Sequence, residues 1–186
     1  MLSEIRTKIR ALISDLSKSD IEVFSYSSGD QIFILAEENI SSIIKVEKNG
    51  VELGSGTYSY DSTTNELTII SSLSSGDLIT CKYNFQKYSD TELNEFCRAS
   101  LVWLSIYADC ETDYELEDEE IVPTIDNKTS DLVALISAIL IQPDYTRYSL
   151  PNLTVVYNGK ETKEKRIEKL IVRFRRGLGV SSILEF

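Results

Sequence analysis

The stretch KVEKNGVELGSGTYSYDSTTNELTI, residues 45–69, decides which fold to expect. Its Asn49-Gly50 pair is the strongest short signal for a β-hairpin, because both central residues of such a turn take positive φ. Apolar and polar residues alternate at 58–60 and again at 66–69, on either side of a second turn. The stretch therefore predicts a meander of short antiparallel strands.

The two-residue period continues on both sides of this stretch. Apolar residues alternate from Ile32 to Ala36, and Gly76-Asp77 marks a turn before a run that ends at Phe85. About five or six short strands are expected between residues 30 and 86, which is enough for a small sandwich or a curled sheet.

Helical periodicity replaces this pattern toward both ends of the chain. Residues 2–17 carry one apolar stripe, and the capping box at 89–92 predicts the start of a second helix. A third helix is predicted over 132–141, after a cap at 129–131, and a fourth over about 162–176. Trp103 and the cysteines are assigned to the core.

The expected fold class is α+β, with a bundle of about four helices and an antiparallel β-subdomain inserted between the first and second helices. Residues 1–20 and 88–186 would form the helical core, and residues 21–87 the inserted β-subdomain. The acidic run 111–120 lacks the glycine of a calcium-binding loop, so a solvated linker or lumen-facing loop is expected there. Residues 144–159 are expected to form an extended or looped crossover.

The composition excludes several kinds of catalytic and metal-binding site. The chain has no histidine, which removes Ser-His and Cys-His pairs and most zinc sites, and it has no glycine-rich phosphate-binding motif. No cofactor or metal is expected. Carboxylate-only catalysis stays open. Cys81, Cys97 and Cys110 form no C-x-x-C pair, which fits a reducing cytoplasm, and the apolar runs are too short for a membrane span.

Charge is unevenly distributed along the chain. Residues 160–176 contain eight basic and three acidic residues, a net charge of +5, whereas the whole chain carries −11, which leaves −16 on the rest. This segment is either a basic handle for an acidic partner or nucleic acid, or an ordinary solvated helix face. The pattern alone favours neither.

Two segments, YSDTELNEFCRASLVWLSIYA at 88–108 and LPNLTVVYNGKETKEKRIEKL at 150–170, carry a family resemblance. With the order of the predicted helices, they resemble the head-to-tail connector, or adaptor, proteins of tailed bacteriophages. The resemblance implies a non-enzymatic virion protein, made in the host cytoplasm and located at the neck. Such proteins form a ring, usually twelve-fold, that bridges portal and tail and extends the DNA channel.

The resemblance also implies partners: the portal protein, a tail or stopper (tail-terminator) protein, neighbouring copies in the ring, and double-stranded DNA in transit, with no membrane. An acidic channel wall would repel phosphates and let DNA slide. Docking to the portal or another partner is assigned to the basic helix and the apolar tail. The assigned residues are Arg173, Phe174, Arg175, Arg176, Leu178, Ile183, Leu184 and Phe186.

Two other functions remain open. One is a carbohydrate-binding module of a baseplate or fibre, which would use tyrosines of the β region, such as Tyr58, Tyr60, Tyr83 and Tyr88, although tyrosine on a sheet is usually ordinary packing. The other is a carboxylate-dependent enzyme, for which no paired carboxylates stand out.

Overall fold

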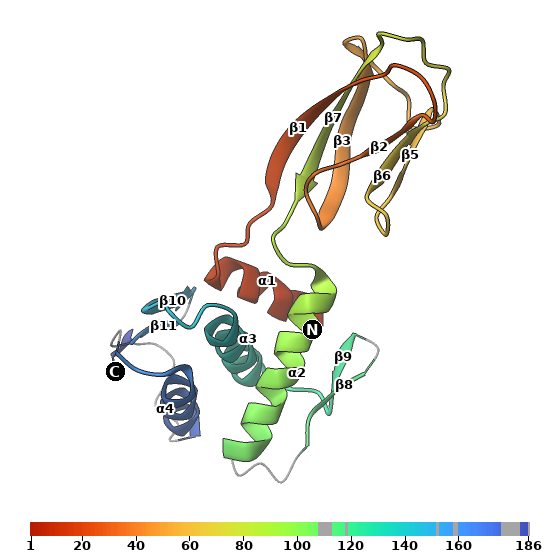
Figure 1. The fold of residues 1–186 in the computed structure, drawn as a ribbon. Helices are drawn as coiled ribbons and strands as arrows, with labels where there is room; N and C mark the ends of the chain where they lie inside the picture. Colours follow the sequence, from red (N-terminus) through yellow and green to blue (C-terminus); the bar gives the residue numbers. More distant parts are fainter. Residues whose placement is uncertain (108–112, 118, 152, 158–159, 176–182, 186) are drawn as a thin grey trace. The chain divides into compact units, whose positions relative to one another are not determined.

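The computed structural model describes residues 1–107, 113–117, 119–151, 153–157, 160–175 and 183–185. Contacts divide the chain into two compact units: unit 1 comprises Met1–Asp15 and Asp90–Phe186, and unit 2 comprises Leu16–Ser89. The elements are shown in Figure 1. They are α1 (Leu2–Leu12), β1 (Lys18–Ser25), β2 (Ile32–Ile34), β3 (Ile40–Lys48), β4 (Val51–Glu52), β5 (Tyr58–Asp61), β6 (Glu66–Ile69), β7 (Leu78–Phe85), α2 (Asp90–Tyr107), β8 (Glu115–Glu117), β9 (Glu120–Val122), α3 (Asn127–Ile141), β10 (Arg147–Leu150), β11 (Leu153–Val156), α4 (Lys163–Arg175) and β12 (Ile183–Glu185).

The expected fold class is wrong. The described residues form a mixed α/β fold with four helices and several mostly antiparallel sheets, instead of a helical bundle with one β-subdomain inserted between its first two helices. Strands precede α2 rather than interrupting a bundle, and five more strands, β8 to β12, lie among and after the later helices. These later strands are only three or four residues long, which is too short for an alternating pattern to be distinctive in the sequence.

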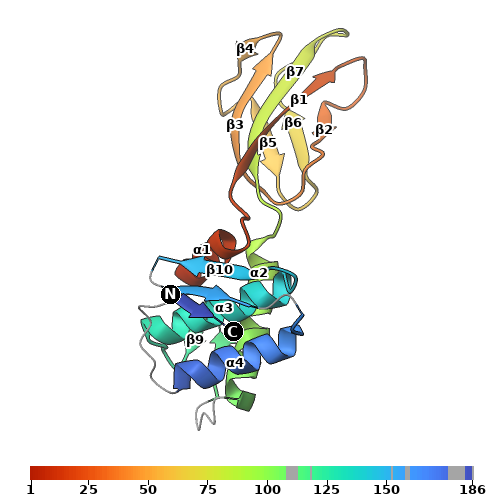
Figure 2. The same cartoon turned by 90° about the vertical axis from the view of Figure 1, so that its left-hand side faces the viewer.

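Unit 2, whose residues are all described, packs two sheets against each other (Figures 1 and 2). One sheet has the strand order β1-β7-β3-β4 and the other β2-β6-β5. Inward-facing residues from both sheets form one core, which includes Phe33, Val46, Leu67, Ile79 and Tyr83. The alternation in the sequence places these residues on the inner faces, because side chains in a strand point to opposite sides in turn.

The predicted hairpin at Asn49-Gly50 is confirmed. The two residues have φ of 52° and 79° and join β3 to β4. Asp77 fixes this turn from the neighbouring loop: its carboxylate accepts hydrogen bonds from Asn49 Nδ2 at 2.7 Å and from the amide of Ser74 at 2.7 Å, and it pairs with Lys48 Nζ at 2.9 Å. These contacts hold the pKa of Asp77 at about 2, chiefly through Lys48.

Unit 1 is built around α3, which contacts each of the other three described helices. Its central residues are buried on all sides, in keeping with a sequence that is apolar nearly all round the helix. The helix begins at Asn127, five residues before the predicted start, so the predicted cap at 129–131 is wrong. The side chain of Asp126 accepts a hydrogen bond from the amide of Thr129 at 2.7 Å and forms the cap instead.

Two segments of unit 1 that were expected to be irregular contain strands. The acidic run forms the antiparallel hairpin β8–β9, in which Leu116 pairs with Ile121 and both are buried. The expected crossover at 144–159 contains the hairpin β10–β11, to which β12 is added in parallel. The expected linker or loop at 111–120 and the expected extended or looped crossover at 144–159 thus each contain a short strand pair, which buried apolar residues at alternate positions stabilise.

Candidate functional site

Helix α2 has two apolar faces. One is the core face, on which Leu93, Cys97 and Leu104 are buried. The other is a stripe at helical spacing that lines a groove of about 290 Å³. The residues of this α2 stripe are Ala99, Val102, Trp103, Ile106 and Tyr107. Val102 and Ile106 are 56% and 63% exposed, so the stripe is an apolar surface that the described residues leave open to solvent.

The α2 stripe includes a pair of stacked aromatic rings. The rings of Trp103 and Tyr107 stack with centroids 5.1 Å apart and planes 17° from parallel. Side chains of this type supply large contact areas at low entropic cost, and they dominate the binding energy of many protein interfaces. The stripe therefore has the composition of a protein-binding surface.

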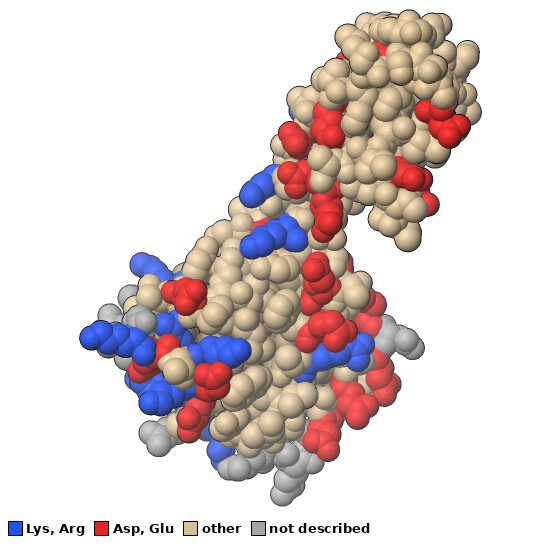
Figure 3. Space-filling model, viewed as in Figure 1, with Lys and Arg blue, Asp and Glu red and all other residues tan. Residues whose placement is uncertain are grey.

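A basic helix borders the stripe on one side. Arg175 at the end of α4 donates a hydrogen bond from Nη1 to the carbonyl oxygen of Tyr107 at 3.3 Å, which brings α4 to the C-terminal end of the stripe. A cation is favourable there because the last carbonyls of a helix carry partial negative charge. Lys163 and Lys165, at the opposite end of α4, are exposed. Figure 3 shows lysine and arginine gathered on this side of unit 1.

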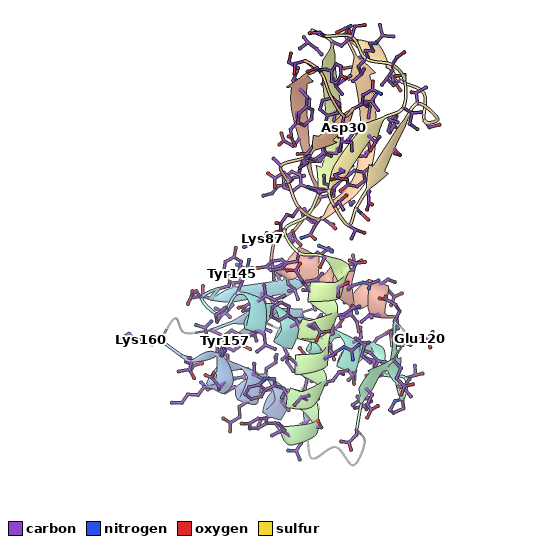
Figure 4. The ribbon with its side chains drawn as sticks, turned by 45° about the vertical axis from the view of Figure 1, so that its right-hand side comes forward. Asp30, Lys87, Glu120, Tyr145, Tyr157 and Lys160 are labelled. Atoms are coloured by element: carbon purple, nitrogen blue, oxygen red, sulfur yellow. The ribbon has the colours of Figure 1, made fainter. Side chains whose placement is uncertain are left out.

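The acidic hairpin β8–β9 lies on the other side of unit 1. Glu117 and Glu120 face each other across β8–β9, and Glu115 pairs with Val122, so these four residues share the face opposite the buried Leu116. All four are exposed. Figure 3 shows acidic residues gathered on this side, and in Figure 4 Glu120 and Lys160 lie on opposite sides of unit 1.

The structure places some of the sequence-predicted docking residues beside the stripe. Arg175 is exposed and contacts α2, whereas Arg173 and Phe174 are half-buried. The backbones of Ile183 and Leu184 belong to β12 and pair with β11. The remaining predictions lie outside the described residues. These are Arg176, Leu178 and Phe186.

Sequence reasoning missed the stripe itself. Trp103 was assigned to the core, but it is only half-buried and lines the groove. The sequence does contain a signal for the second face, because α2 carries more apolar residues than a single core-facing stripe requires. Val102 and Ile106 continue a second line along the helix, and this second line could have been recognised as a separate face.

The cysteines and tyrosines of the sequence predictions are largely interior. Cys81 and Cys97 are fully buried, as predicted, and burial raises the pKa of their thiols to about 12 and about 11. Cys110 lies outside the described residues. Tyr83 is buried, and Tyr58 and Tyr60 pack against the core of unit 2, so these rings do not form an open sugar-binding platform.

The described residues contain neither a metal-binding cluster nor a membrane-spanning helix. No group of three or more His, Cys, Asp or Glu side chains in them is arranged to hold a metal ion. None of their helices is long and apolar enough to cross a membrane.

The sequence matches none of the known protein-family models and none of the curated proteins with which it was compared.

Proposed function

We propose that this chain is a structural virion protein of a tailed bacteriophage, without enzymatic activity, in which copies form a ring at the head-tail junction. The ring bridges the portal and a tail or stopper protein and extends the channel through which double-stranded DNA passes. The family resemblance of residues 88–108 and 150–170 supports this proposal.

The observation that carries the proposal is the α2 stripe. It lies within the first of the two resembling segments, and α4, which borders it, overlaps the second. When a partner covers an exposed apolar surface with stacked aromatic rings, the complex is stabilised by about 25 cal/mol per Å² of apolar area removed from water. Charged side chains on α4, which reaches the stripe at Tyr107, and on the β8–β9 hairpin elsewhere in unit 1 add orientation and selectivity.

The charge of the chain also fits a channel protein. With a net charge of −11, the chain as a whole repels phosphate groups, which favours passage of DNA over binding. Six basic residues lie in α4, and two of them, Lys163 and Lys165, are exposed at its N-terminal end.

Immunogold electron microscopy of the virions whose genome encodes this chain tests the location. We expect an antibody to the chain to label the neck, between head and tail, and particles from a phage lacking the gene to stay unlabelled. Label at the distal tail would contradict the proposal, and so would its absence from particles that contain every other structural protein.

A pair of substitutions tests the stripe. Val102→Asp with Ile106→Asp places two charges on the stripe, so we expect the variant to fold but to be missing from purified virions when it replaces the wild-type chain. Val51→Asp with Ile70→Asp is the matched control, because these residues are 68% and 61% exposed in unit 2. Normal incorporation of the stripe variant would exclude the stripe as an assembly surface.

A further inference from the structure

Strand β1 forms one edge of the first sheet of unit 2, beside β7 (Figure 1). Its register with β7 runs without a break from Lys18 to Ser25. The amide of Tyr26 donates to the carbonyl oxygen of Asp77 at 2.9 Å, so by the alternation of an antiparallel pair the even-numbered residues of β1 bond to β7. The backbone groups of the odd-numbered residues therefore point away from the sheet. These residues are Ser19, Ile21, Val23 and Ser25.

The outward backbone groups of β1 make no backbone hydrogen bond within unit 2, all of whose residues the structure describes. The amide of Ile21 donates instead to Oδ1 of the neighbouring Asp20 at 2.8 Å. The other edge of this sheet differs, because β4 pairs with the end of β3 and the β3–β7 register shifts twice. Irregular strands discourage the addition of a further strand. The regular edge of β1 is therefore the one to which a strand can be added.

The outer face of the sheet beside this edge is apolar. Ile21 and Val23 lie on the same face of β1 and are 56% and 61% exposed. Leu78, opposite Ser25 on β7, is also exposed and continues this surface onto the next strand. A strand added to β1 places alternate side chains beside this surface. Apolar side chains at those positions are removed from water.

The other face of β1 carries two carboxylates at the edge. Asp20 is exposed and Glu22 is half-buried. Glu22 accepts hydrogen bonds from the hydroxyl of Tyr83 and from the amide of Ala36, which fix its position. Neither carboxylate takes part in an ion pair of unit 2, whose residues are all described. Basic side chains on an added strand therefore find opposite charges on this face.

We propose that β1 binds an extended strand of a partner protein in which apolar and basic residues alternate. The apolar side chains cover Ile21 and Val23, and the basic side chains meet Asp20 and Glu22. The backbone of the partner supplies the hydrogen bonds that the open edge lacks. The proposal concerns unit 2 alone and is independent of the α2 stripe and of the proposed ring.

A second copy of β1 does not fit as the partner. The longest antiparallel registers that match the outer faces set Asp20 opposite Glu22, or Glu22 opposite the same residue of the other copy. Lys18, the one basic residue of β1, meets neither carboxylate in these registers. Like charges directly opposite each other destabilise a strand pair. The carboxylates therefore oppose self-pairing and favour a basic strand.

Binding of a synthetic strand to the full chain tests the proposal. The probe is a peptide of alternating valine and lysine with blocked ends, as long as the 8 residues of β1, and its control has glutamate in place of lysine. Amide hydrogen exchange followed by NMR gives the readout. We expect the lysine peptide to slow exchange at Val23 and Ser25 about tenfold or more, while Phe24, which already bonds to β7, changes little. The glutamate peptide should bind about tenfold or more weakly.

Three variants test the edge and its charge, with circular dichroism to confirm folding. Val23→Pro removes an outward N–H without removing a bond to β7, so we expect it to fold but to bind the lysine peptide about tenfold or more weakly. Ser55→Pro is the control, because it lies at the second position of the turn closed by the bond from the Thr57 amide to the Gly54 carbonyl oxygen at 2.9 Å. Asp20→Lys should reduce the preference for the lysine peptide about threefold or more.

Any of three results would overturn the proposal. The first is unchanged exchange at Val23 and Ser25 with the lysine peptide at about millimolar concentration. The second is equal binding of the two peptides, and the third is unchanged binding by a folded Val23→Pro chain. If Val23→Pro does not fold, the comparison of the two peptides on the wild-type chain and on Asp20→Lys still decides.

Discussion

At the scale of single residues, Arg166 is the least expected interior side chain. It is 1% exposed, and its Nη1 donates to the carbonyl oxygens of Pro143 and Tyr145 at 2.5 and 2.7 Å. Its guanidinium carbon lies 5.3 Å from the centre of the Tyr157 ring. A buried cation thus joins α4 to the turn that precedes β10 and supplies hydrogen-bond donors to two carbonyl groups of that turn.

Replacing Arg166 with Met should destabilise unit 1. Met fills a similar volume but leaves two carbonyl groups without their donor, so we expect a loss of about 2–4 kcal/mol in the free energy of unfolding. Urea unfolding followed by the fluorescence of Trp103, the only tryptophan of the chain, measures it. Lys165→Met, at an exposed position of the same helix, is the control and should change stability by less than about 0.5 kcal/mol. Equal effects would show that the interior contacts of Arg166 are dispensable.

Asp77 predicts a pH dependence for unit 2. Its pKa of about 2 in the folded chain lies below its ordinary value of 3.8, because Lys48, Ser74 and Asn49 stabilise the carboxylate. Its contribution to stability is therefore fully present above pH 4 and is lost as the pH falls from about 4 to about 2. The chemical shift of the Asp77 carboxyl carbon, followed by NMR, should show a titration near pH 2. The Asp77→Asn variant should lose less unfolding free energy than the wild type between about pH 4 and about pH 2. Titration near pH 4 would contradict the role of this contact.

At the scale of elements, the two faces of α2 should respond differently to truncation. Leu104 is 2% exposed and Ile106 is 63% exposed on the same helix. Leu104→Ala should cost about 2–5 kcal/mol, because it leaves a cavity in the core. Ile106→Ala should stay within about 0.5 kcal/mol. Urea unfolding followed by far-UV circular dichroism compares them, and a large loss for Ile106→Ala would show that this face is covered in the isolated chain.

Sequence patterns predicted those elements whose signal is local. The turn at Asn49-Gly50 and the strand from Leu78 to Phe85 were found because turn chemistry and alternation act over a few residues. The hairpin β8–β9 was missed because acidic residues are uncommon in strands, and only its packing against unit 1 makes the alternation of Leu116 and Ile121 meaningful. For the same reason, periodicity located the apolar residues of α2 but could not tell which of its two faces is covered.

At the scale of the whole molecule, the described residues place one buried thiol in each compact unit. Cys97 on α2 belongs to unit 1 and Cys81 on β7 to unit 2, and both are fully buried. Burial keeps both thiols protonated and unreactive, since the thiolate is the nucleophile. Modification of either side chain therefore requires opening of the unit that contains it.

Thiol labelling should report the opening of each unit separately. In a Cys110→Ser background, we expect Arg166→Met to accelerate modification of Cys97 while leaving that of Cys81 nearly unchanged, and Asp77→Asn to do the reverse. Peptide mass spectrometry after timed alkylation locates the label. Parallel changes at both thiols would show that the units open together as one cooperative structure.

The turn at Asn49-Gly50 also determines how the protein ages chemically. Asparagine followed by glycine loses its amide readily, because the unhindered glycine nitrogen can attack the side chain. In the folded turn this side chain is occupied: Nδ2 donates to Asp77 at 2.7 Å and Oδ1 accepts from the amide of Leu78 at 2.8 Å. Conversion to aspartate would set a second carboxylate against Asp77. Storage damage should therefore begin in molecules whose turn has opened, and each damaged chain would close that turn less well than before.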